Sequence, residues 1–497
     1  TALQLVPCSG AGAGQQLVSH PDVDVVILTG GTDTAIAMLR RKPDLQLLAE
    51  TGGKNATIVT TLSDRDLAIK HVLHSAFSHA GQKCSATSLL ILEEEVYNDE
   101  AFKQALCDAI RSIPAGSAWD LRTKMGPLIR RPTGALETGL KELEAGESWA
   151  VMPRFSEENP HVVTPGLKWG VQPGSFTHLT EFFGPLLGVI KARNLTEAIG
   201  FVNQTGYGLT SGLESLDDRE QAIWVESVRA GNLYINRSTT GAIVLRQPFG
   251  GMGKSAFGPG IKAGGPNYVA QLMRFRDLRT PSVQCDNLDP HVAQLIDALA
   301  DSFGKELAAE VVPPLTAAVH SYQAAMNDEF GARHDSFRLL GEDNYRRYLP
   351  VKELRVRLHP DDSCFDILAR VCAAHTAGCR ITVSKPLEMD ARIFNALERA
   401  TESWAAAVEF VEESDEALAE VARLHHTDRL RYADPRRVPA VVREAVIDNG
   451  IFIADAPVLM QGRLELLWYV REQSVCHDYH RYGNLGIRSD ERRSEPA

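Results

Sequence analysis

A cysteine with the surroundings of a nucleophile lies in the segment Gly81-Gln82-Lys83-Cys84-Ser85-Ala86, between a predicted helix and a predicted strand. A cysteine that attacks a carbonyl carbon reacts as the thiolate, which a helix terminus or a nearby cation favours. Gly81 would let the backbone turn closely around a substrate. Most free cysteines are inert core residues, so the assignment of Cys84 needs support from other residues.

A carboxylate follows a predicted parallel strand in the segment Glu50-Thr51-Gly52-Gly53-Lys54-Asn55. Ligands of open α/β sheets gather at the carboxyl ends of the strands. Glu50 could therefore activate water to hydrolyse a thioester formed on Cys84. The alternative is a glutamate that caps a helix or is solvated.

A second carboxylate stands beside an aromatic ring in Glu181-Phe182-Phe183-Gly184-Pro185. A carboxylate and a ring next to a fixed turn could hold a ribose and pack on a nicotinamide. The alternative is a common turn at the edge of a strand.

Together, the three motifs resemble the aldehyde dehydrogenase superfamily in order and in spacing. Glu50 precedes Cys84 by 34 residues, Glu181 follows it by 97, and Pro248-Phe249-Gly250-Gly251 comes later. The resemblance covers about residues 1–275.

The resemblance implies a role for each matched residue. Cys84 would be the nucleophile, and Glu50 would be the base that hydrolyses the thioester. The implied contacts of a nicotinamide dinucleotide, NAD, are Thr29, Gly30, Gly31, Thr51, Glu181 and Phe183. Thr29-Gly30-Gly31 is not a Gly-x-Gly-x-x-Gly fingerprint, so the cofactor follows from the resemblance alone. The implied reaction is attack on the aldehyde, hydride transfer, thioester hydrolysis and release of an acid.

The substrate class comes from a narrower match. Residues 231–265 are similar to the glutamate γ-semialdehyde branch, also called Δ1-pyrroline-5-carboxylate dehydrogenases. The carboxylate and amine of that substrate call for backbone N–H groups and hydroxyls. The predicted substrate contacts are Ser85, Gly253, Ser255, Ala256 and Phe257. For Ser255, the alternative is a serine that only forms a turn.

The C-terminal part resembles the end of the bifunctional proline utilization A proteins over residues 463–488. Residues 365–386 also resemble the helix and strand that open an aldehyde dehydrogenase cofactor domain. Residues 281–497 contain no second Gly-Gln-x-Cys motif and no second Glu-Thr-Gly-Gly motif. We therefore expect a non-catalytic copy of the fold that acts through contact, as a lid or an assembly surface. The cysteines expected to be structural are Cys364, Cys372, Cys379 and Cys476.

The elements that must position these residues predict an α/β protein. Strands are expected at 22–31, 45–49, 88–92, 186–191, 231–236 and 380–384, and helices at 32–41, 63–82, 99–113 and 365–377. This pattern predicts an aldehyde dehydrogenase fold, with a partial Rossmann-type cofactor domain and an α/β catalytic domain, followed by a second aldehyde-dehydrogenase-like α/β domain. The expected boundaries are 1–52 for the rest of the NAD-binding domain, 53–275 for the catalytic domain, 276–330 for a helical linker, 331–487 for the C-terminal domain and 488–497 for a disordered tail.

Composition narrows the function classes. A net charge of −12 argues against general nucleic-acid binding, and no apolar run reaches the length of a membrane helix. Eight cysteines without a paired framework favour a reducing compartment, taken as the cytoplasm. No metal site is predicted from the histidines His71, His74, His79, His477 and His480, which are more typical of surface or core groups.

The chain begins at Thr1 rather than Met, and we interpret it as a fragment. The superfamily's oxyanion asparagine and adenosine contacts would lie upstream, as would the flavin-binding (FAD) barrel of a bifunctional protein. No flavin is assigned to this chain, and the chain alone is expected to be a poor dehydrogenase. The expected partners are a small-molecule substrate and further copies of the chain. The alternatives are a degenerate scaffold module and a dehydrogenase of another aldehyde.

Overall fold

A computed structural model describes residues 2–302, 305–404 and 407–495. Its N-terminal part is a β-α-β unit, as predicted, in which β1 (Val25–Thr29) and β2 (Gln46–Glu50) pair in parallel and α2 (Thr32–Arg41) connects them. The short strand β12 (Ala256–Phe257) adds to the other edge of β2 in antiparallel orientation. Strand β1 is the free edge of this three-stranded sheet, and Ile27 on it is 56% exposed.

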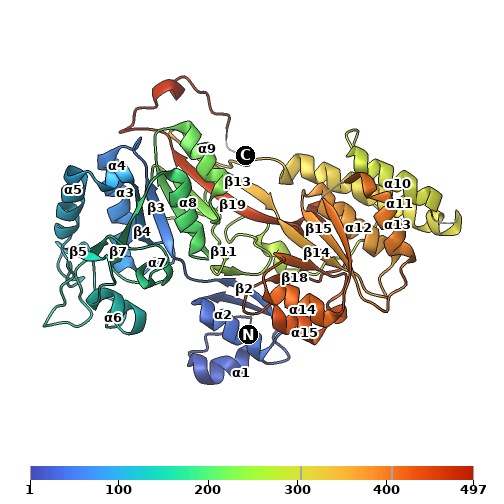
Figure 1. The fold of residues 1–497 in the computed structure, drawn as a ribbon, viewed down its shortest axis with the longest axis horizontal. Helices are drawn as coiled ribbons and strands as arrows, with labels where there is room; N and C mark the ends of the chain where they lie inside the picture. The colour runs from blue at the N-terminus through green and yellow to red at the C-terminus, as the bar shows by residue number, and fades with distance from the viewer. Residues whose placement is uncertain (1, 303–304, 405–406, 496–497) are drawn as a thin grey trace.

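A nine-stranded sheet forms the centre of the molecule (Figure 1), in the order β13-β19-β10-β9-β3-β4-β7-β6-β5. The strands from β10 to β6 are parallel, and β5 and β13 run antiparallel to their neighbours. The strands predicted at 88–92, 186–191 and 231–236 are confirmed as β4, β7 and β10. The bounds are β3 (Asn55–Val59), β4 (Thr87–Glu93), β5 (Ser148–Val151), β6 (Gly166–Trp169), β7 (Leu186–Ala192), β9 (Thr210–Glu214), β10 (Asn232–Ile235), β13 (Glu342–Pro350) and β19 (Val470–Asp478).

Helices cover both faces of this sheet, which explains the continuous apolar run of β4. Leu90 and Leu92 pack with α3 (Arg65–Phe77) and α5 (Glu100–Arg111). Leu89 and Ile91 pack on the opposite face with α8 (Leu195–Gln204) and α9 (Asp218–Ser227). All four side chains are fully buried. A parallel strand buried on both faces has no polar alternation, because neither face meets water.

The C-terminal unit is a second α/β layer built on a five-stranded parallel sheet in the order β16-β15-β14-β17-β18. Its predicted helix and strand are confirmed as α12 (Cys364–Thr376) and β15 (Arg380–Lys385), and Gly378 between them has a φ of +80°. The other strands are β14 (Glu353–Arg357), β16 (Val408–Glu412), β17 (Arg429–Arg431) and β18 (Phe452–Ala454). The strand order is that of a doubly wound sheet.

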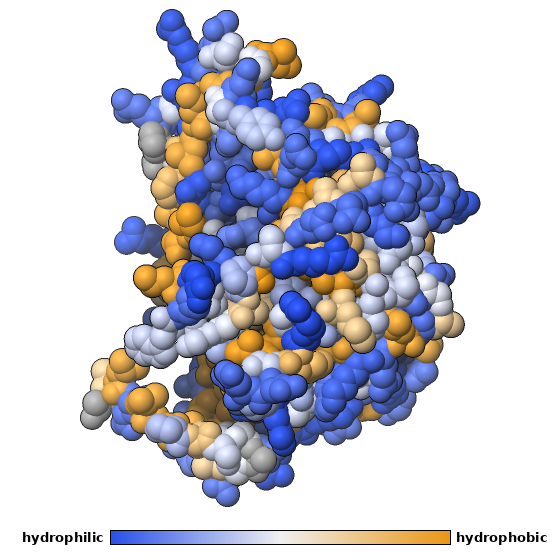
Figure 2. Space-filling model, turned by 90° about the vertical axis from the view of Figure 1, so that its left-hand side faces the viewer, coloured by the Kyte–Doolittle hydropathy of each residue, from blue (hydrophilic) through white to orange (hydrophobic). Residues whose placement is uncertain are grey.

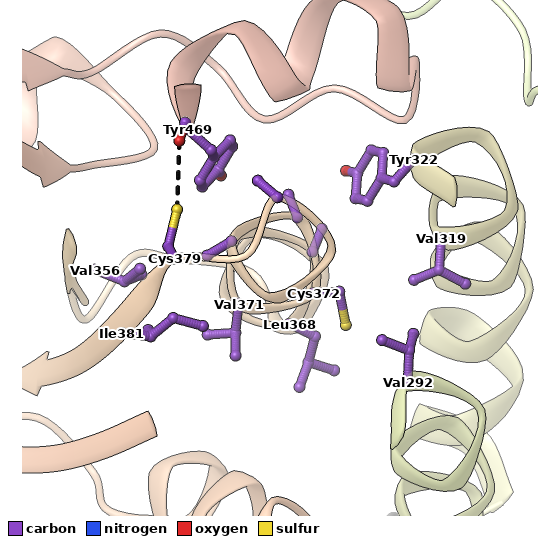
Figure 3. Close-up of a cluster of buried hydrophobic side chains, with 14 of the residues drawn as sticks. Val292, Val319, Tyr322, Val356, Leu368, Val371, Cys372, Cys379, Ile381 and Tyr469 are labelled. Carbon is purple, nitrogen blue, oxygen red and sulfur yellow. Dashed lines mark hydrogen bonds between the residues drawn. The ribbon is translucent and has the colours of Figure 1, made fainter. Parts of the chain in front are cut away.

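The segment predicted as a linker, residues 276–330, contributes two helices to the core of this unit. Helices α10 (Pro290–Ser302) and α11 (Lys305–Ala325) bury Val292, Val319 and Tyr322 against Leu368 and Cys372 of α12. Figure 3 shows these side chains facing one another, and it shows the Sγ of Cys379 near the carbonyl oxygen of Tyr469, 3.3 Å away. The apolar faces of the two helices explain why this segment packs rather than links.

The tail predicted to be disordered is docked as far as residue 495. Arg488 donates to Asp343 of β13 at 2.8 Å, and Arg493 donates to the same carboxylate at 2.5 Å. The guanidinium of Arg488 also lies 3.6 Å from the centre of the Tyr479 ring. The expectation of disorder for 488–495 is therefore wrong, because the charged side chains of this segment pair with oppositely charged groups of the sheet. Residues 496–497 lie outside the described residues.

Polar residues predominate on the face drawn in Figure 2, where apolar residues are scattered in small groups. Among the described residues, no helix has the length and apolar character needed to cross a bilayer.

The C-terminal strand β19 is part of the nine-stranded sheet, which the sequence did not predict. It pairs in parallel with β10, where Ser474 faces Asn232, and antiparallel with β13, where Cys476 faces Asn344. Val475 is 1% exposed and packs in the same core cluster as Leu213 and Leu233. The catalytic and C-terminal units therefore share one sheet.

We expect removal of residues 470–495 to abolish cooperative thermal unfolding, because β13 loses its neighbouring strand and β10 loses one of its two. Removal of 482–495 is the matched control, since it spares β19 and deletes only partly exposed ion pairs. The control should unfold within about 4 °C of the parent chain. Circular dichroism measures both, and a parent-like transition without β19 would contradict the role assigned to this strand.

Candidate active site

The turn that carries Cys84 has an unusual backbone. Helix α3 ends at Phe77, earlier than the predicted 82, because His79, Ala80 and Gly81 have φ values of 56°, 54° and 67°. A Cβ atom at Gly81 would lie 2.2 Å from the carbonyl oxygen of Gly184. Glycine is thus required where the cysteine motif touches the Glu181–Pro185 motif.

Asn55 holds the cysteine turn in place, a role that the sequence did not reveal. Its Nδ2 donates to the carbonyl oxygens of Cys84 at 2.6 Å and Ala86 at 3.0 Å. Its Oδ1 accepts from the N–H of Thr210 at 3.0 Å. Asn55 begins β3 directly after the Glu-Thr-Gly-Gly-Lys segment, and this adjacency was the available signal.

The thiol of Cys84 is partly buried, and burial raises its pKa above the usual value. The backbone N–H of Ser85 opposes this rise in pKa, while the carboxylates of Glu50 and Glu181 add to it. The expectation that a cation or a helix terminus favours the thiolate is therefore not met, since burial is the largest cause of the shift. Cys84 rests as a thiol and must lose its proton to react.

Glu50 lies at the carboxyl end of β2, as predicted, and its Oε2 accepts from the N–H of Gly251 at 2.9 Å. Burial raises the pKa of Glu50 to about 7, against the opposing effects of the Lys262 cation and the Gly251 N–H. A Cβ atom at Gly250 would lie 2.7 Å from Oε1 of Glu50. The Gly250-Gly251 pair thus gives the carboxylate room and a donor, and a group with this pKa can act as a base near neutral pH.

Glu181 reaches across to the Glu50 motif through its two glycines. Its Oε1 accepts from the N–H of Gly53 at 2.9 Å, and a Cβ atom at Gly52 would lie 1.8 Å from Oε2. Burial raises the pKa of Glu181. Phe183, with a φ of 52°, is 42% exposed at this turn. The structure therefore brings the Glu50, Cys84 and Glu181 motifs into contact with one another.

The residues expected to meet the dinucleotide lie at the end of β1. Thr29, Gly30 and Gly31 are exposed. Gly31 is the N-cap of the ten-residue helix α2, so no N-cap side chain accepts from the first N–H groups of this helix. The first N–H groups of such a helix can bind phosphate oxygens. The hydroxyl of Thr51, by contrast, donates to the carbonyl oxygen of Lys254 at 2.7 Å. Contact of these residues with a dinucleotide remains a prediction, and the hydroxyl of Thr51 already has a partner within the fold.

The expected substrate contacts lie beside the site, and several are occupied by the fold. Ser255 is fully buried, and its hydroxyl accepts from the N–H of Gly208 at 3.1 Å. Phe257 packs in the core between β2 and α2, and Ser85 is 5% exposed. Gly253 is exposed with a φ of 57°, and Ala256 is half-buried. Their role toward a substrate remains a prediction.

A cavity of about 80 Å³ lies next to Glu50, between the strands β1 and β2 and the loop after β12. Its lining residues include Thr29, Glu50, Ala256, Phe257, Ile261 and Tyr268. Predicted cofactor and substrate contacts thus share one small space with the predicted base.

Outside this site, one group of side chains among the described residues has the composition of a metal site. The ligand atoms of Glu342, Cys476 and Asp478 lie within 4.8 Å of one another. Nη1 of Arg237 lies 2.8 Å from the Glu342 carboxylate and 2.6 Å from the Cys476 sulfur. The guanidinium thus supplies the positive charge at this position.

Comparison with known proteins agrees with this geometry. The profile of the aldehyde dehydrogenase family matches residues 1–278. Proteins named 1-pyrroline-5-carboxylate dehydrogenase are 34% identical in Geobacillus thermodenitrificans and 33% identical in Bacillus subtilis, each over 283 residues, 55% of this chain and 54% of the relative. The chain thus spans about half the length of these curated relatives.

Two solved structures extend the likeness. Proline utilization A (PutA) from Corynebacterium freiburgense is 38% identical with a TM-score of 0.78, and the match covers 96% of this chain and 44% of that one. A 1-pyrroline-5-carboxylate dehydrogenase from Thermus with bound NAD is 30% identical with a TM-score of 0.50, over 54% of this chain and 52% of that one. With the family profile matching more than half of its length, the chain belongs to the aldehyde dehydrogenase family.

Proposed function

We propose that this chain oxidises L-glutamate γ-semialdehyde to L-glutamate with NAD, the second step of proline catabolism. The observation that carries the proposal is the contact of the Glu50, Cys84 and Glu181 motifs through Gly52, Gly81 and Gly250. The names of the relatives and of the solved structures support the substrate class. Intact catalytic side chains weigh against a degenerate scaffold.

The proposed chemistry follows from the charge state of each group. The Cys84 thiol releases its proton to solvent as its sulfur adds to the aldehyde carbon, and the aldehyde oxygen becomes an alkoxide. The alkoxide then re-forms the C=O bond as a hydride leaves the carbon, for which bound NAD would supply the acceptor. The resulting thioester is attacked by water, whose proton Glu50 accepts, and the acid is released with the thiol restored. Burial of Cys84 and Glu50 lowers the local dielectric constant and so strengthens the interactions between charges that form in these steps.

The dinucleotide would be held at two places. The N-terminus of α2, which follows the exposed Thr29-Gly30-Gly31 and has no side-chain cap, would hold its phosphates. Glu181 and Phe183, on the turn that touches the Cys84 motif, would hold the ribose and nicotinamide.

We also propose a cytoplasmic location and a homo-oligomer. All eight cysteines are free, as expected in a reducing compartment. Light scattering tests the assembly.

The substrate is tested by comparing turnover of glutamate γ-semialdehyde with that of propanal by the 497-residue chain, with NAD as acceptor. A site that reads the carboxylate and amine should favour the semialdehyde by at least about tenfold in kcat/KM, since one charged hydrogen bond contributes about 1.5–3 kcal/mol. Equal turnover of both aldehydes would contradict the substrate assignment.

Cys84→Ala should abolish aldehyde oxidation while leaving dinucleotide affinity within a few-fold, because the sulfur forms the only covalent intermediate. Cys107→Ala is the matched control: Cys107 lies buried in α5, and its loss should leave turnover in place. Reduced cofactor is followed by absorbance and binding by calorimetry. Oxidation by Cys84→Ala near the parent rate would contradict the assignment of Cys84 as the nucleophile.

Thioester hydrolysis should rise with pH and reach half its maximum near pH 7, since the pKa of Glu50 is about 7 and the carboxylate is the base. Glu50→Gln should retain a burst of reduced cofactor and slow the steady phase by about 10²–10⁴-fold. Stopped-flow absorbance separates the two phases. A variant that also loses the burst would mean that Glu50 acts before hydride transfer.

A further inference from the structure

A buried lysine stands behind the predicted base. Lys262 follows the loop after β12, its side chain is 1% exposed, and its ammonium donates to the carbonyl oxygen of Gly250. The same Nζ lies 3.4 Å from Oδ1 of Asn232. Neither partner carries a charge, so these bonds alone do not compensate a buried ammonium.

Lys262 and Glu50 meet across a single glycine. A Cβ atom at Gly250 would lie 2.7 Å from Oε1 of Glu50 and 3.4 Å from Cγ of Lys262. Both side chains therefore press on the same face of the Pro-Phe-Gly-Gly segment. An ammonium and a carboxylate buried around one glycine attract each other more strongly than they would in water.

The lysine is fixed from the other side by strand β19. Oε2 of Glu472 accepts from the backbone N–H of Lys262 at 2.8 Å, and Oε1 accepts from Nδ2 of Asn267 at 2.6 Å. Glu472 is itself 1% exposed. The lysine thus cannot withdraw to solvent, and its position relative to Glu50 is set by the C-terminal strand.

We infer that Lys262 is a positioning residue for Glu50, whose ammonium keeps the buried carboxylate in the ionised form that a general base needs. The inference rests on the proposed role of Glu50. A buried carboxyl group without a nearby cation favours the neutral acid, which cannot accept a proton from water.

Other titratable groups around Glu50 do not replace this cation. Cys84, on the turn before β4, and Tyr268, after the loop of Lys262, are the acids whose pKa values the Glu50 carboxylate raises. Burial lowers the pKa of Lys262 to about 8, and the carboxylates of Glu50 and Glu472 oppose this fall. Lys262 lowers the pKa of Glu50, and burial raises it.

The test is an infrared titration of Glu50 in the 497-residue chain, with the protonated carboxyl band assigned by subtracting the spectrum of Glu50→Gln. Lys262→Met removes both the charge and the hydrogen-bond donor. Lys262→Gln removes the charge and keeps an N–H for the Gly250 oxygen. Both variants should raise the midpoint of Glu50 by about one to two pH units.

Lys168→Gln is the matched control, because Lys168 is an equally buried lysine paired with Glu147 at 2.9 Å in another part of the sheet. The titration midpoint of Glu50 in the Lys168→Gln variant should equal that in the parent chain. A parent-like midpoint in Lys262→Gln would show that the hydrogen bond matters instead of the charge, and this would overturn the inference. If Lys262→Met does not fold, Lys262→Gln decides alone.

The titration needs no turnover, so its result is separate from that of the proposed function. A shifted midpoint in a chain that turns over propanal as well as the semialdehyde supports the role of Lys262 and contradicts the substrate assignment. An unshifted midpoint in an active chain contradicts only the role of Lys262.

Discussion

Strand β19 has a hydrogen-bonded neighbour on each edge, β10 on one side and β13 on the other, and the rest of the molecule depends on this pairing. The strand also reaches the loop after β12, since the N–H of Glu472 donates to the carbonyl oxygen of Gly260 at 3.0 Å. Arg429 of β17 donates to the carbonyl oxygen of Pro259 at 2.6 Å. The loop beside Glu50 thus takes its shape from residues of the C-terminal unit, 170 positions further along the chain in the case of Arg429.

Burial is the common cause behind the chemistry of the site. It raises the pKa values of Cys84, Glu50 and Glu181, and it lowers the pKa of Lys262 to about 8. The glycines of the three motifs make this density possible, because each lets backbone and carboxylate approach where a Cβ atom would collide. Burial thus brings the pKa of Glu50 to about 7, which suits a general base near neutral pH.

The C-terminal sheet has the strand order of a dinucleotide-binding unit, but its switch point is filled. In a doubly wound sheet, ligands bind beyond the carboxyl ends of the strands where the order reverses, here between β14 and β17. Arg370, fully buried, donates to the carbonyl oxygens of Arg357 and Arg431 at the ends of those two strands. It also pairs with Asp362 at 2.5 Å. Arg370 therefore occupies the position where a doubly wound sheet would bind its ligand. This agrees with the absence of a second cysteine motif from the sequence of this unit.

Much of this protein could be predicted from the sequence, because it depends on local pattern: the β-α-β unit of residues 25–50, the strands β4, β7 and β10, helix α12, and the motifs of Glu50, Cys84 and Glu181. The order and spacing of those motifs also indicated the family. Only the tertiary structure decided that β19 is part of the nine-stranded sheet, that residues 276–330 contribute two helices to a core, and that Lys262 faces Glu50. These features come from pairings between residues far apart in the chain, and a window of sequence carries no information about which distant edge or charge a segment will meet.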